Sequence, residues 1–571
     1  MSATRITGKE YPVKDILCNK FIMRIPNYQR PYAWGTEQVQ TLLEDLLNAL
    51  GDPDDHTDDR EAYFLGSIVL VKDEHSPDAD VVDGQQRLTT LTILMAVIRA
   101  ALENQKLRDQ ITEMIFSPEK ILLGEKASYF LTLREKDREF FQKYIQEDEL
   151  LEKLSTADPN KLTQSQINII KNARLLQTML SKYTQGQLVN LVRYISNNCY
   201  LIIVTTPTTD SAHRIFSVLN DRGLDLSYTD ICKAELIGAI GSRQPELEDA
   251  YTQKWEDAEE QIGREGFKDL FSHIRTILLK ARLKDTILKE LRNSVFPKYE
   301  GRPTAFIDDV LLPYKNAYDV IKTFSYQNDN LSGEVNGILR WLRWIDNSDW
   351  LPVAMLAYQR YSHDSAKFLS ILKHLERLAA SLTISRANVN TRQTRYNEVL
   401  TWIEQGKDWT APDSPLQLSP AEIVATLNLL QGDIYNSGAR GYILRRLNGL
   451  LSEDKTTPDT PIFTIEHVLP QNPSANSRWL QWYPDEKERL RITQTLGNLA
   501  LLSKRKNSAA GNSDFETKKN QYFVTPVTQF ALTTSIIRES DWTRPVYERR
   551  QAMLVNLLKV AWRLDSPENR N

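Results

Sequence analysis

Two adjacent residues in the last quarter of the chain carry groups that phosphodiester hydrolysis requires. Glu466 and His467 end the apolar part of FTIEHVLP, at residues 463–470, a pattern that predicts a strand. An imidazole can take a proton from water, and a carboxylate is a hard oxygen ligand suited to Mg²⁺ or Mn²⁺. His467 is therefore a candidate general base and Glu466 a candidate metal ligand facing the same site. The alternative is that both residues merely end a buried strand.

Two asparagines follow at a spacing that suits the same chemistry. Asn498 lies in LGNLALLS, at residues 496–503, and Asn507 follows nine residues later. We assign Asn498 to orient the catalytic imidazole and Asn507 to the metal as a second ligand. The pattern resembles the HNH, or ββα-metal, nucleases, in which an acid–His pair on one strand faces an Asn on the next strand and a third ligand on the following helix.

The local composition favours this hypothesis over the simple end of a strand. The chain has seven histidines, and His467 is the only one after His374. From Arg491 onward there are 13 Lys or Arg against 7 Asp or Glu, although the whole chain has a net charge of −4. A basic segment in an acidic protein suits contact with phosphate. The candidate DNA contacts are Lys504, Arg505, Lys506, Lys518 and Lys519, and a solvated helical face is the alternative.

A second stretch, DGQQRLTT at residues 83–90, has the features of a phosphate-binding turn. A predicted strand ends at Asp83, the chain turns at Gly84, and an apolar helix begins. Glycine allows close approach of a ligand, a helix amino terminus attracts anions, and Arg87 adds a fixed positive charge. Gln85 and Gln86 could position water or a base edge. A plain junction of strand, turn and helix remains at least as probable on the residues alone.

Two further polar stretches are candidates for the same nucleotide site. IPNYQRPYAW, at residues 25–34, places Tyr28, Gln29 and Arg30 among aromatic rings, which can stack on bases or simply cover a core. NDRGLDL, at residues 220–226, offers Asn220, Arg222 and Asp225. The alternative role of the second stretch is turn formation and helix capping.

Length and composition describe an ordinary globular protein of several domains. The 571 residues are 41% hydrophobic and 26% charged, and no apolar run approaches the ~20 residues of a membrane span. We therefore expect a cytoplasmic protein without membrane contact. Three scattered cysteines provide neither a disulfide framework nor a zinc site.

Apolar periodicity predicts the elements that must position these residues. Helices are expected at 36–50, from Leu88 onward, at 274–291 and at 368–384, and strands at 65–71, 80–83 and 199–205. Tryptophans between 341 and 350 predict buried helix packing, with a partner surface as the alternative. Trp479, Trp482 and Tyr483 should anchor the insert between the two strands of the proposed nuclease, with contact to DNA as the alternative. The polar, proline-bearing run 410–420 is the best candidate for a domain boundary.

Together these stretches resemble the GmrSD-like type IV restriction proteins. The resemblance is carried by IPNYQRPYAW, DGQQRLTTL, IFSVLNDRGLDLSYTDICK, IEHVLPQ, and LGNLALLS followed by NSAAGNSDFETKK. It implies an amino-terminal domain of the ParB/sulfiredoxin-like fold, with NTPase activity attributed to DGQQR, and a carboxy-terminal HNH nuclease. Residues 83–87 would belong to the NTP site, which would bind GTP or ATP, and residues 28–30 would lie near it.

The expectation is an α+β, multidomain protein. Its parts are an α/β NTPase and sensor domain at 1–240, a helical spacer at 241–412, and a helical domain with the nuclease motif at 413–571. The expected function is an NTP-regulated, metal-dependent endonuclease, active on modified phage DNA and acting as a homodimer. A nucleotide-switched DNA-binding sensor with a weak nuclease, or an RNA-cutting abortive-infection effector, is the alternative.

Overall fold

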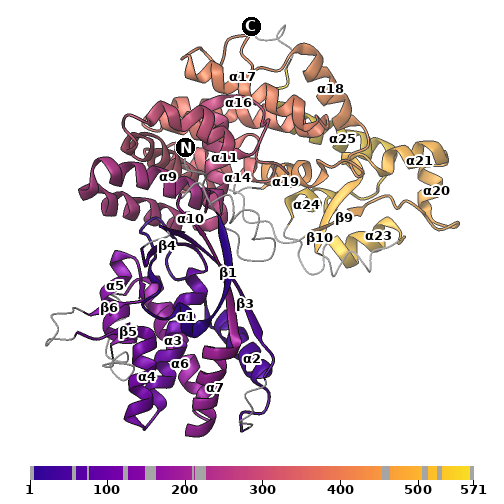
Figure 1. Ribbon diagram of the computed structural model, residues 1–571. Coiled ribbons are helices and arrows are strands. Elements are labelled where there is room, and N and C mark those ends of the chain that lie inside the picture. The colour runs from indigo at the N-terminus through magenta and orange to yellow at the C-terminus, as the bar shows by residue number, and fades with distance from the viewer. Residues whose placement is uncertain are drawn as a thin grey trace. The chain divides into compact units, whose positions relative to one another are not determined.

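The computed structural model describes ten stretches of the chain, which fall into two compact units. They are residues 6–54, 60–73, 76–119, 127–147, 162–208, 211–212, 227–452, 463–503, 512–523 and 530–565. The amino-terminal unit is Met1–Glu256 and the carboxy-terminal unit is Asp257–Asn571. Both units contain helix and strand, so the α+β class is confirmed (Figure 1). Among the described residues, no helix has the length and apolar character that crossing a membrane requires.

A six-stranded mixed sheet organises the amino-terminal unit. Its order is β1-β8-β3-β4-β2-β7, with β1 against β8 and β3 against β4 antiparallel and the other neighbours parallel. The bounds are β1 Thr7–Pro12, β2 Ile22–Arg24, β3 Tyr63–Lys72, β4 Asp78–Asp83, β7 Leu131–Thr132 and β8 Cys199–Thr206. A separate pair joins β5 (Phe116–Ser117) to β6 (Ser128–Tyr129). The three strands predicted in this unit are confirmed.

Helices pack against this sheet, with α3 at the centre. Their bounds are α1 Val13–Ile16, α2 Thr36–Leu50, α3 Gln85–Ala101, α4 Gln105–Ile115, α5 Glu135–Phe141 with the π-helix η2 Gln142–Gln146, α6 Gln164–Leu180, α7 Gln185–Asn198 and α9 Tyr228–Arg243. Figure 1 shows α3, α4, α6 and α7 gathered together. Most of α3 is buried on all sides, because apolar side chains and threonines fill its faces. The predicted helix at 36–50 matches α2.

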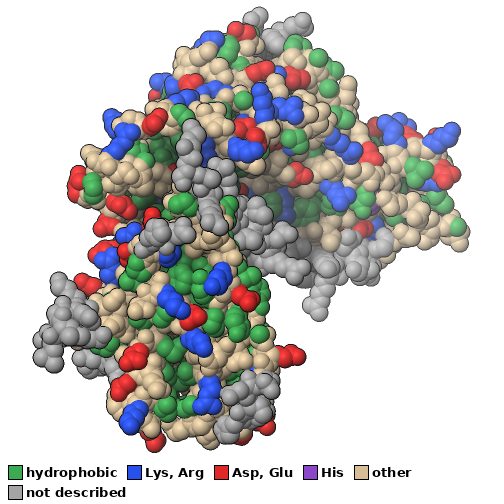
Figure 2. Space-filling view, in the orientation of Figure 1, with side chains coloured by type: hydrophobic (Ala, Val, Ile, Leu, Met, Phe, Trp, Pro, Cys, Tyr) green, Lys and Arg blue, Asp and Glu red, His purple; other side chains and the backbone are tan. Residues whose placement is uncertain are grey.

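Hydrophobic side chains also reach the surface of the amino-terminal unit (Figure 2). Phe64 is 58% exposed on β3 and Ile202 is 38% exposed on β8. Tyr200 lies opposite Phe64 in the sheet register. Because side chains alternate between the faces of a strand, Tyr200 and Ile202 share one face of the sheet.

The carboxy-terminal unit is mainly helical, with one antiparallel hairpin. Its helices are the carboxy-terminal part of α10 (Pro245–Leu279), α11 Ile287–Glu290, η5 Leu291–Val295, η6 Phe296–Tyr299, α12 Thr304–Phe306, η7 Ile307–Leu311, α13 Leu312–Thr323, α14 Ser332–Arg343, α15 Leu351–Tyr361, α16 Ser365–Ile384, α17 Val389–Glu404, α18 Pro420–Gln431, α19 Arg440–Leu451, α20 Arg478–Trp482, α21 Glu486–Thr493, η8 Leu496–Asn498, α23 Phe515–Thr517, η9 Lys518–Phe523, α24 Ala531–Ile537 and α25 Arg544–Ala561. The hairpin joins β9 (Phe463–His467) to β10 (Leu499–Ser503).

The helix predicted at 274–291 is wrong in its extent. Helix α10 ends at Leu279, because Lys280 has a positive φ of 48° that a right-handed helix cannot contain. Thr286 then caps α11, and its side chain accepts a hydrogen bond from Lys289 N at 3.3 Å. The helix predicted at 368–384 is confirmed as α16, and Trp341 and Trp350 are buried as expected.

The segment proposed as a domain boundary is held against neighbouring helices. Arg395 of α17 donates to the backbone oxygens of Pro415, at 2.6 Å, and Gln417, at 2.5 Å. Arg377 of α16 donates to Leu416 O at 3.3 Å. Run 410–420 is therefore tied to the helical part, and the division at 240 and 412 stays a prediction.

Candidate functional site

Glu466 and His467 lie at the end of β9, where the sequence predicts them, but their side chains face different surroundings. In the hairpin register, His467 pairs with Leu499 and Glu466 with Ala500. Successive side chains on a strand point to opposite faces of the sheet. The two side chains therefore leave β9 on opposite faces, and the assignment of Glu466 and His467 to one metal site stays a prediction.

The carboxylate of Glu466 is paired with a buried lysine. Lys518 Nζ donates to Glu466 Oε1 and to the backbone oxygen of His467, both at 2.6 Å. The Lys518 side chain is 0% exposed. Burial raises the pKa of Glu466 and lowers that of Lys518, and the attraction between the two charges offsets part of both shifts. The prediction that Lys518 contacts DNA is wrong for this structure, because its ammonium group is enclosed and already paired.

The imidazole of His467 is held in its neutral form. Burial lowers its pKa to about 4, and the nearby side chains of Gln494 and Asp433 offset only part of this effect. The Tyr435 ring lies 4.3 Å from the imidazole, measured between centroids, and Gln471 Nε2 lies 3.5 Å from His467 Nε2. An uncharged imidazole near neutral pH can accept a proton, as a general base must.

Four of these neighbours were not predicted from the sequence. Asp433 and Tyr435 belong to the turn after α18, and this turn is fixed because Ile434 N and Tyr435 N donate to Gln494 O at 2.9 and 3.0 Å. The only available signal was the polar turn GDIYNSG, which resembles many other turns. Gln471 ends the stretch IEHVLPQ, but no spacing rule assigns it to the imidazole, and Gln494 has no such signal.

Asn498 does not orient the imidazole. Its side chain is fully buried, and Oδ1 accepts from Leu469 N at 2.7 Å. Its amide nitrogen donates to Leu469 O at 2.9 Å and to Thr493 O at 3.2 Å. Asn498 therefore fixes the backbone that follows β9, and it positions His467 only through the chain.

The remaining predicted nuclease residues divide into two groups. Asn507, Lys504, Arg505 and Lys506 lie outside the described residues. Lys519 is described, and its Nζ donates to Glu539 O at 2.8 Å. On the face of the molecule shown in Figure 2, basic side chains of the described residues lie among acidic ones.

The described residues alone do not complete a divalent-metal site. Within them, no group of three His, Cys, Asp or Glu side chains could hold a metal ion. Glu466 is the only predicted metal ligand among them, and Lys518 occupies one of its oxygens. The other predicted ligand, Asn507, lies outside the described residues.

Helix α25 fixes the turn that carries Asn498. Arg550 donates to the backbone oxygens of Leu496, Gly497, Leu499 and Leu532, at 3.3, 2.6, 3.1 and 3.0 Å. Its burial lowers the pKa of the guanidinium to about 9. A β-carbon on Gly497 would lie 2.8 Å from the Tyr547 ring, so glycine permits this close packing.

The aromatic insert between the strands anchors this part of the chain, as predicted. Trp479 is fully buried and donates to Ser513 O at 3.1 Å. Tyr483 donates to Trp542 O at 2.8 Å. Phe515 is buried between Trp479 and Trp542, which seats α23 beside the hairpin.

In the amino-terminal unit, the side-chain amide of Gln86 makes its hydrogen bonds within the protein. Its Oε1 accepts from Ala33 N at 2.8 Å and Trp34 N at 3.1 Å, and its Nε2 donates to Pro31 O at 3.1 Å. This amide binds the IPNYQRPYAW loop to the start of α3. Asn172 of α6, which was not predicted, secures the same loop by donating to Trp34 O at 2.8 Å.

The other glutamines of this region are also buried in the protein. Gln29 donates to Val82 O at 3.2 Å, and Gln85 donates to Gln29 Oε1 at 3.4 Å. Burial raises the pKa of the Tyr28 phenol, and the charges that affect it are those of Asp80 and Arg24. Tyr28 therefore belongs to the side of the loop that faces the Arg24–Asp80 ion pair.

Charged groups gather where β4 meets α3. Gly84 has a φ of 92°, and a β-carbon there would lie 2.8 Å from Ile68 Cγ1, so this turn requires glycine. Burial raises the pKa of Asp83, while the Gly84 N–H, Arg87 and Arg30 act to lower it. Arg87 donates to Ser67 O at 2.9 Å, beside the bulge at Gly66. Asp83, Arg87 and Arg30 therefore form the charged cluster best placed to receive a phosphate or its metal ion.

The third predicted part of the nucleotide site is the stretch at residues 220–226. Asn220, Arg222 and Asp225 lie outside the described residues. Ser227, which follows them, caps α9 and forms a capping box with Asp230.

Two family models match the chain, one for each group of candidate residues. The model "GmrSD restriction endonuclease, N-terminal domain" matches residues 13–237, which include Asp83 and Arg87. The model "GmrSD restriction endonucleases, C-terminal domain" matches residues 424–557, which include Glu466 and His467. No curated protein matches the chain.

Proposed function

Because this chain belongs to the GmrSD family of restriction endonucleases, we propose that it is an NTP-regulated HNH endonuclease that depends on a divalent metal. Its proposed substrate is modified foreign DNA, in particular phage DNA, which it nicks or cleaves. One observation carries the proposal: the imidazole of His467 ends β9, packed against Tyr435, within the range matched by the carboxy-terminal family model.

In this proposal, the residues around His467 prepare it to take a proton from water. Lys518 holds the His467 backbone oxygen, and Asn498 holds the backbone at Leu469, so the imidazole is fixed from both sides along the chain. Gln471 and Gln494 lie beside the ring and can select its tautomer. Mg²⁺ or Mn²⁺, held by Glu466 and Asn507, would stabilise charge on the phosphate.

We further propose that GTP or ATP binds where β4 meets α3. Asp83, Arg87 and Arg30 supply charge there, and the amino terminus of a 17-residue helix supplies backbone N–H groups. Asn220, Arg222 and Asp225 would complete the site. Nucleotide turnover would either license the nuclease or relieve its inhibition.

DNA recognition and assembly complete the proposal. Lys504, Arg505, Lys506 and Lys519 are the proposed phosphate contacts. A single HNH site cuts one strand, so a double-strand break requires a homodimer or two successive nicks. We place the protein in the cytoplasm, where it would meet incoming DNA.

A nicking assay tests the proposed nuclease. Matched modified and unmodified phage DNA, each with and without GTP or ATP, should be cut only when Mg²⁺ or Mn²⁺ is present, and the modified DNA faster. EDTA should stop the reaction. Cleavage that continues in EDTA would show that the reaction needs no divalent metal, which would contradict this part of the proposal.

The Glu466–Lys518 pair favours a second candidate function. A carboxylate already neutralised by a buried ammonium is a poor starting point for a metal site. The second candidate is a nucleotide-switched DNA-binding sensor with a weak or inactive nuclease. Tight DNA binding that depends on nucleotide, without nicking under any metal condition, would support it, whereas degraded RNA would point to an RNA-cutting effector.

A further inference from the structure

A cavity of about 180 Å³ lies in the helical part of the carboxy-terminal unit, far in sequence from both groups of candidate residues. It is lined by α10, the segment between α10 and α11, the turn before α15, and α17. All its lining residues fall between 272 and 397, outside the ranges that the two family models match. The family comparison therefore assigns nothing to it.

The charged groups at the cavity are already paired within the protein. Arg275 binds Glu290 and the backbone oxygens of Ala281 and Arg282. Asp349 accepts from Arg392 Nε at 2.7 Å. A phosphate would find no uncommitted cation among these lining residues, so the site does not suit a nucleotide phosphate.

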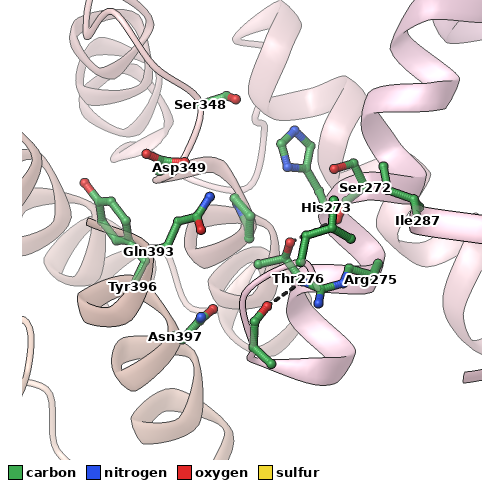
Figure 3. Close-up of a pocket in the computed structure, with 13 residues that line it drawn as sticks. Ser272, His273, Arg275, Thr276, Ile287, Ser348, Asp349, Gln393, Tyr396 and Asn397 are labelled. Carbon is green, nitrogen blue, oxygen red and sulfur yellow. Dashed lines mark hydrogen bonds between the residues drawn. The ribbon is translucent and has the colours of Figure 1, made fainter. Parts of the chain in front are cut away.

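Neutral polar groups, in contrast, face the cavity without partners. Gln393 and Asn397 stand four residues apart on α17, so they share one face of the helix. Figure 3 shows their amides directed across the cavity toward Thr276 and His273 of α10. Within the described residues, neither amide has a hydrogen-bond partner, and the same holds for the His273 imidazole.

Size and shape restrict the ligand further. An engineered cavity of roughly 150 Å³ is large enough to bind benzene, so this cavity can hold about one ring system. Apolar contact is provided by Ala281, Ile287 and Pro352. Paired donors and acceptors on a carboxamide match the edge of a nucleobase, as asparagine and glutamine do when they read adenine.

We propose that this cavity binds one nucleobase, supplied by a free nucleoside or by a base extruded from DNA, with Gln393 and Asn397 on its edge. The ligand is recognised as an uncharged ring, and the phosphorylated form gains nothing from this site. The DNA form of the proposal rests on the proposed function, whereas the nucleoside form does not.

Calorimetric titration of the full chain with adenosine, guanosine, cytidine, thymidine and glucose tests this directly. At least one nucleoside should bind with a Kd on the order of 0.1 mM, which is ordinary for a ligand of this size. Gln393→Leu, which keeps volume and removes the amide, should weaken binding about tenfold or more. Thr394→Ala, an exposed neighbour that does not line the cavity, should leave binding unchanged.

Two further variants keep the test decisive. Ser348→Trp adds a ring at the cavity wall and should also weaken binding, whether or not Gln393→Leu folds well. Binding lost in Asp83→Asn but retained in Gln393→Leu would belong to the amino-terminal unit and would overturn the proposal. Glucose binding in place of every nucleoside, or no binding at all, would overturn it as well.

The source of the base is decided by competition. An oligonucleotide with one unpaired base should displace the bound nucleoside if the cavity reads DNA, and a fully paired one should do so less well. Failure of both oligonucleotides while nucleosides bind would assign the cavity to a free nucleoside. If the protein binds a nucleoside but never nicks DNA, the proposed nucleobase site in the cavity is supported and the proposed nuclease function is contradicted.

Discussion

The two candidate sites share one structural device but treat their charges differently. Gln86 in the amino-terminal unit and Asn498 in the carboxy-terminal unit are buried amides, and each makes three hydrogen bonds to backbone groups. Gln86 binds the loop at residues 31–34, and Asn498 binds Leu469 and Thr493. In both units, a motif residue whose type suggests a catalytic or binding role instead fixes the position of the backbone. A polar motif therefore contains residues that build the site as well as residues that can act in it.

The two sites differ in whether their charged groups are in direct contact. At the first site, Asp83 and Arg87 influence one another while Arg87 donates to a backbone oxygen, so neither charge is cancelled by a direct ion pair among the described residues. At the second site, Glu466 and Lys518 are in contact and His467 is neutral. Asp83 and Arg87 are therefore not in direct contact, whereas the charges of Glu466 and Lys518 neutralise one another.

The largest expected effect is on cutting. His467→Ala should lower the nicking rate by about 10²–10⁴-fold, because it removes the proposed base. NTP hydrolysis should not change, because the residues proposed for it lie in the other unit. Nicking and phosphate release measured on one preparation would check this, with His363→Ala as a control on an exposed histidine. Loss of both activities would mean that the two sites cannot be separated.

Removing Lys518 should damage the folded carboxy-terminal unit. Lys518→Met leaves Glu466 buried without its partner, which typically costs about 3–5 kcal/mol. The double variant Glu466→Gln with Lys518→Met should recover much of the loss, because no buried charge remains. Urea unfolding of the two variants and of the unaltered protein measures this. If Lys518→Met leaves stability unchanged but flattens the salt dependence of DNA binding, the lysine is a phosphate contact after all.

The two amides allow a matched test of the shared device. Gln86→Leu and Asn498→Leu should each lower the free energy of unfolding by about 1–3 kcal/mol, because backbone partners are left unsatisfied. Hydrogen exchange should report each loss only in the unit that carries the substitution. An Asn498→Leu protein of normal stability that no longer nicks DNA would instead give this residue a direct part in the chemistry.

Acidification should act on the two units differently, because the buried imidazoles of His467 and His273 lie in the carboxy-terminal unit. His467 and His273 have folded pKa values of about 4, below the ordinary 6.5. Their stabilisation is complete above pH 6.5 and is lost as pH falls toward 4, at a rate of at most about 1.4 kcal/mol per pH unit for each. Asp83 and Glu466, whose pKa values are raised, contribute the opposite sign, because their stabilisation is lost as pH rises through the folded value.

Hydrogen exchange at pH 7 and pH 5 checks this expectation. The carboxy-terminal unit should lose more protection than the amino-terminal unit on acidification. His273→Gln should reduce that loss, because glutamine does not titrate. Equal losses in both units would show that the buried imidazoles do not set the difference.

The sequence predicts elements and strand ends well, because these depend on local patterns. Helix α2, strand β8 and the turn at Gly84 follow from apolar spacing and from the conformational freedom of glycine. The Glu466–Lys518 pair does not, because the two residues are 52 positions apart and a buried lysine looks like a solvated one in sequence. For the same reason the basic run around 504–519 suggested a DNA surface at a position where one lysine is enclosed.

The neighbours of His467 illustrate a second limit. Tyr435 reaches the imidazole only because the turn after α18 binds the backbone oxygen of Gln494. No spacing rule connects residues 435, 467 and 494. The helix break at Lys280 was missed because its cause is a single left-handed backbone conformation in an otherwise helical pattern.

The hydrogen bonds that Arg550 donates to the turn at residues 496–499 can form only late in synthesis of the chain. The turn at residues 496–499 leaves the ribosome before α25, whose arginine binds its carbonyl oxygens. A nascent chain that stops short of Arg544 would thus carry His467 on an unsupported hairpin. We expect ribosome-stalled chains of that length to be inert toward DNA, so that the proposed nuclease site matures only after the amino-terminal unit of the same polypeptide has been made.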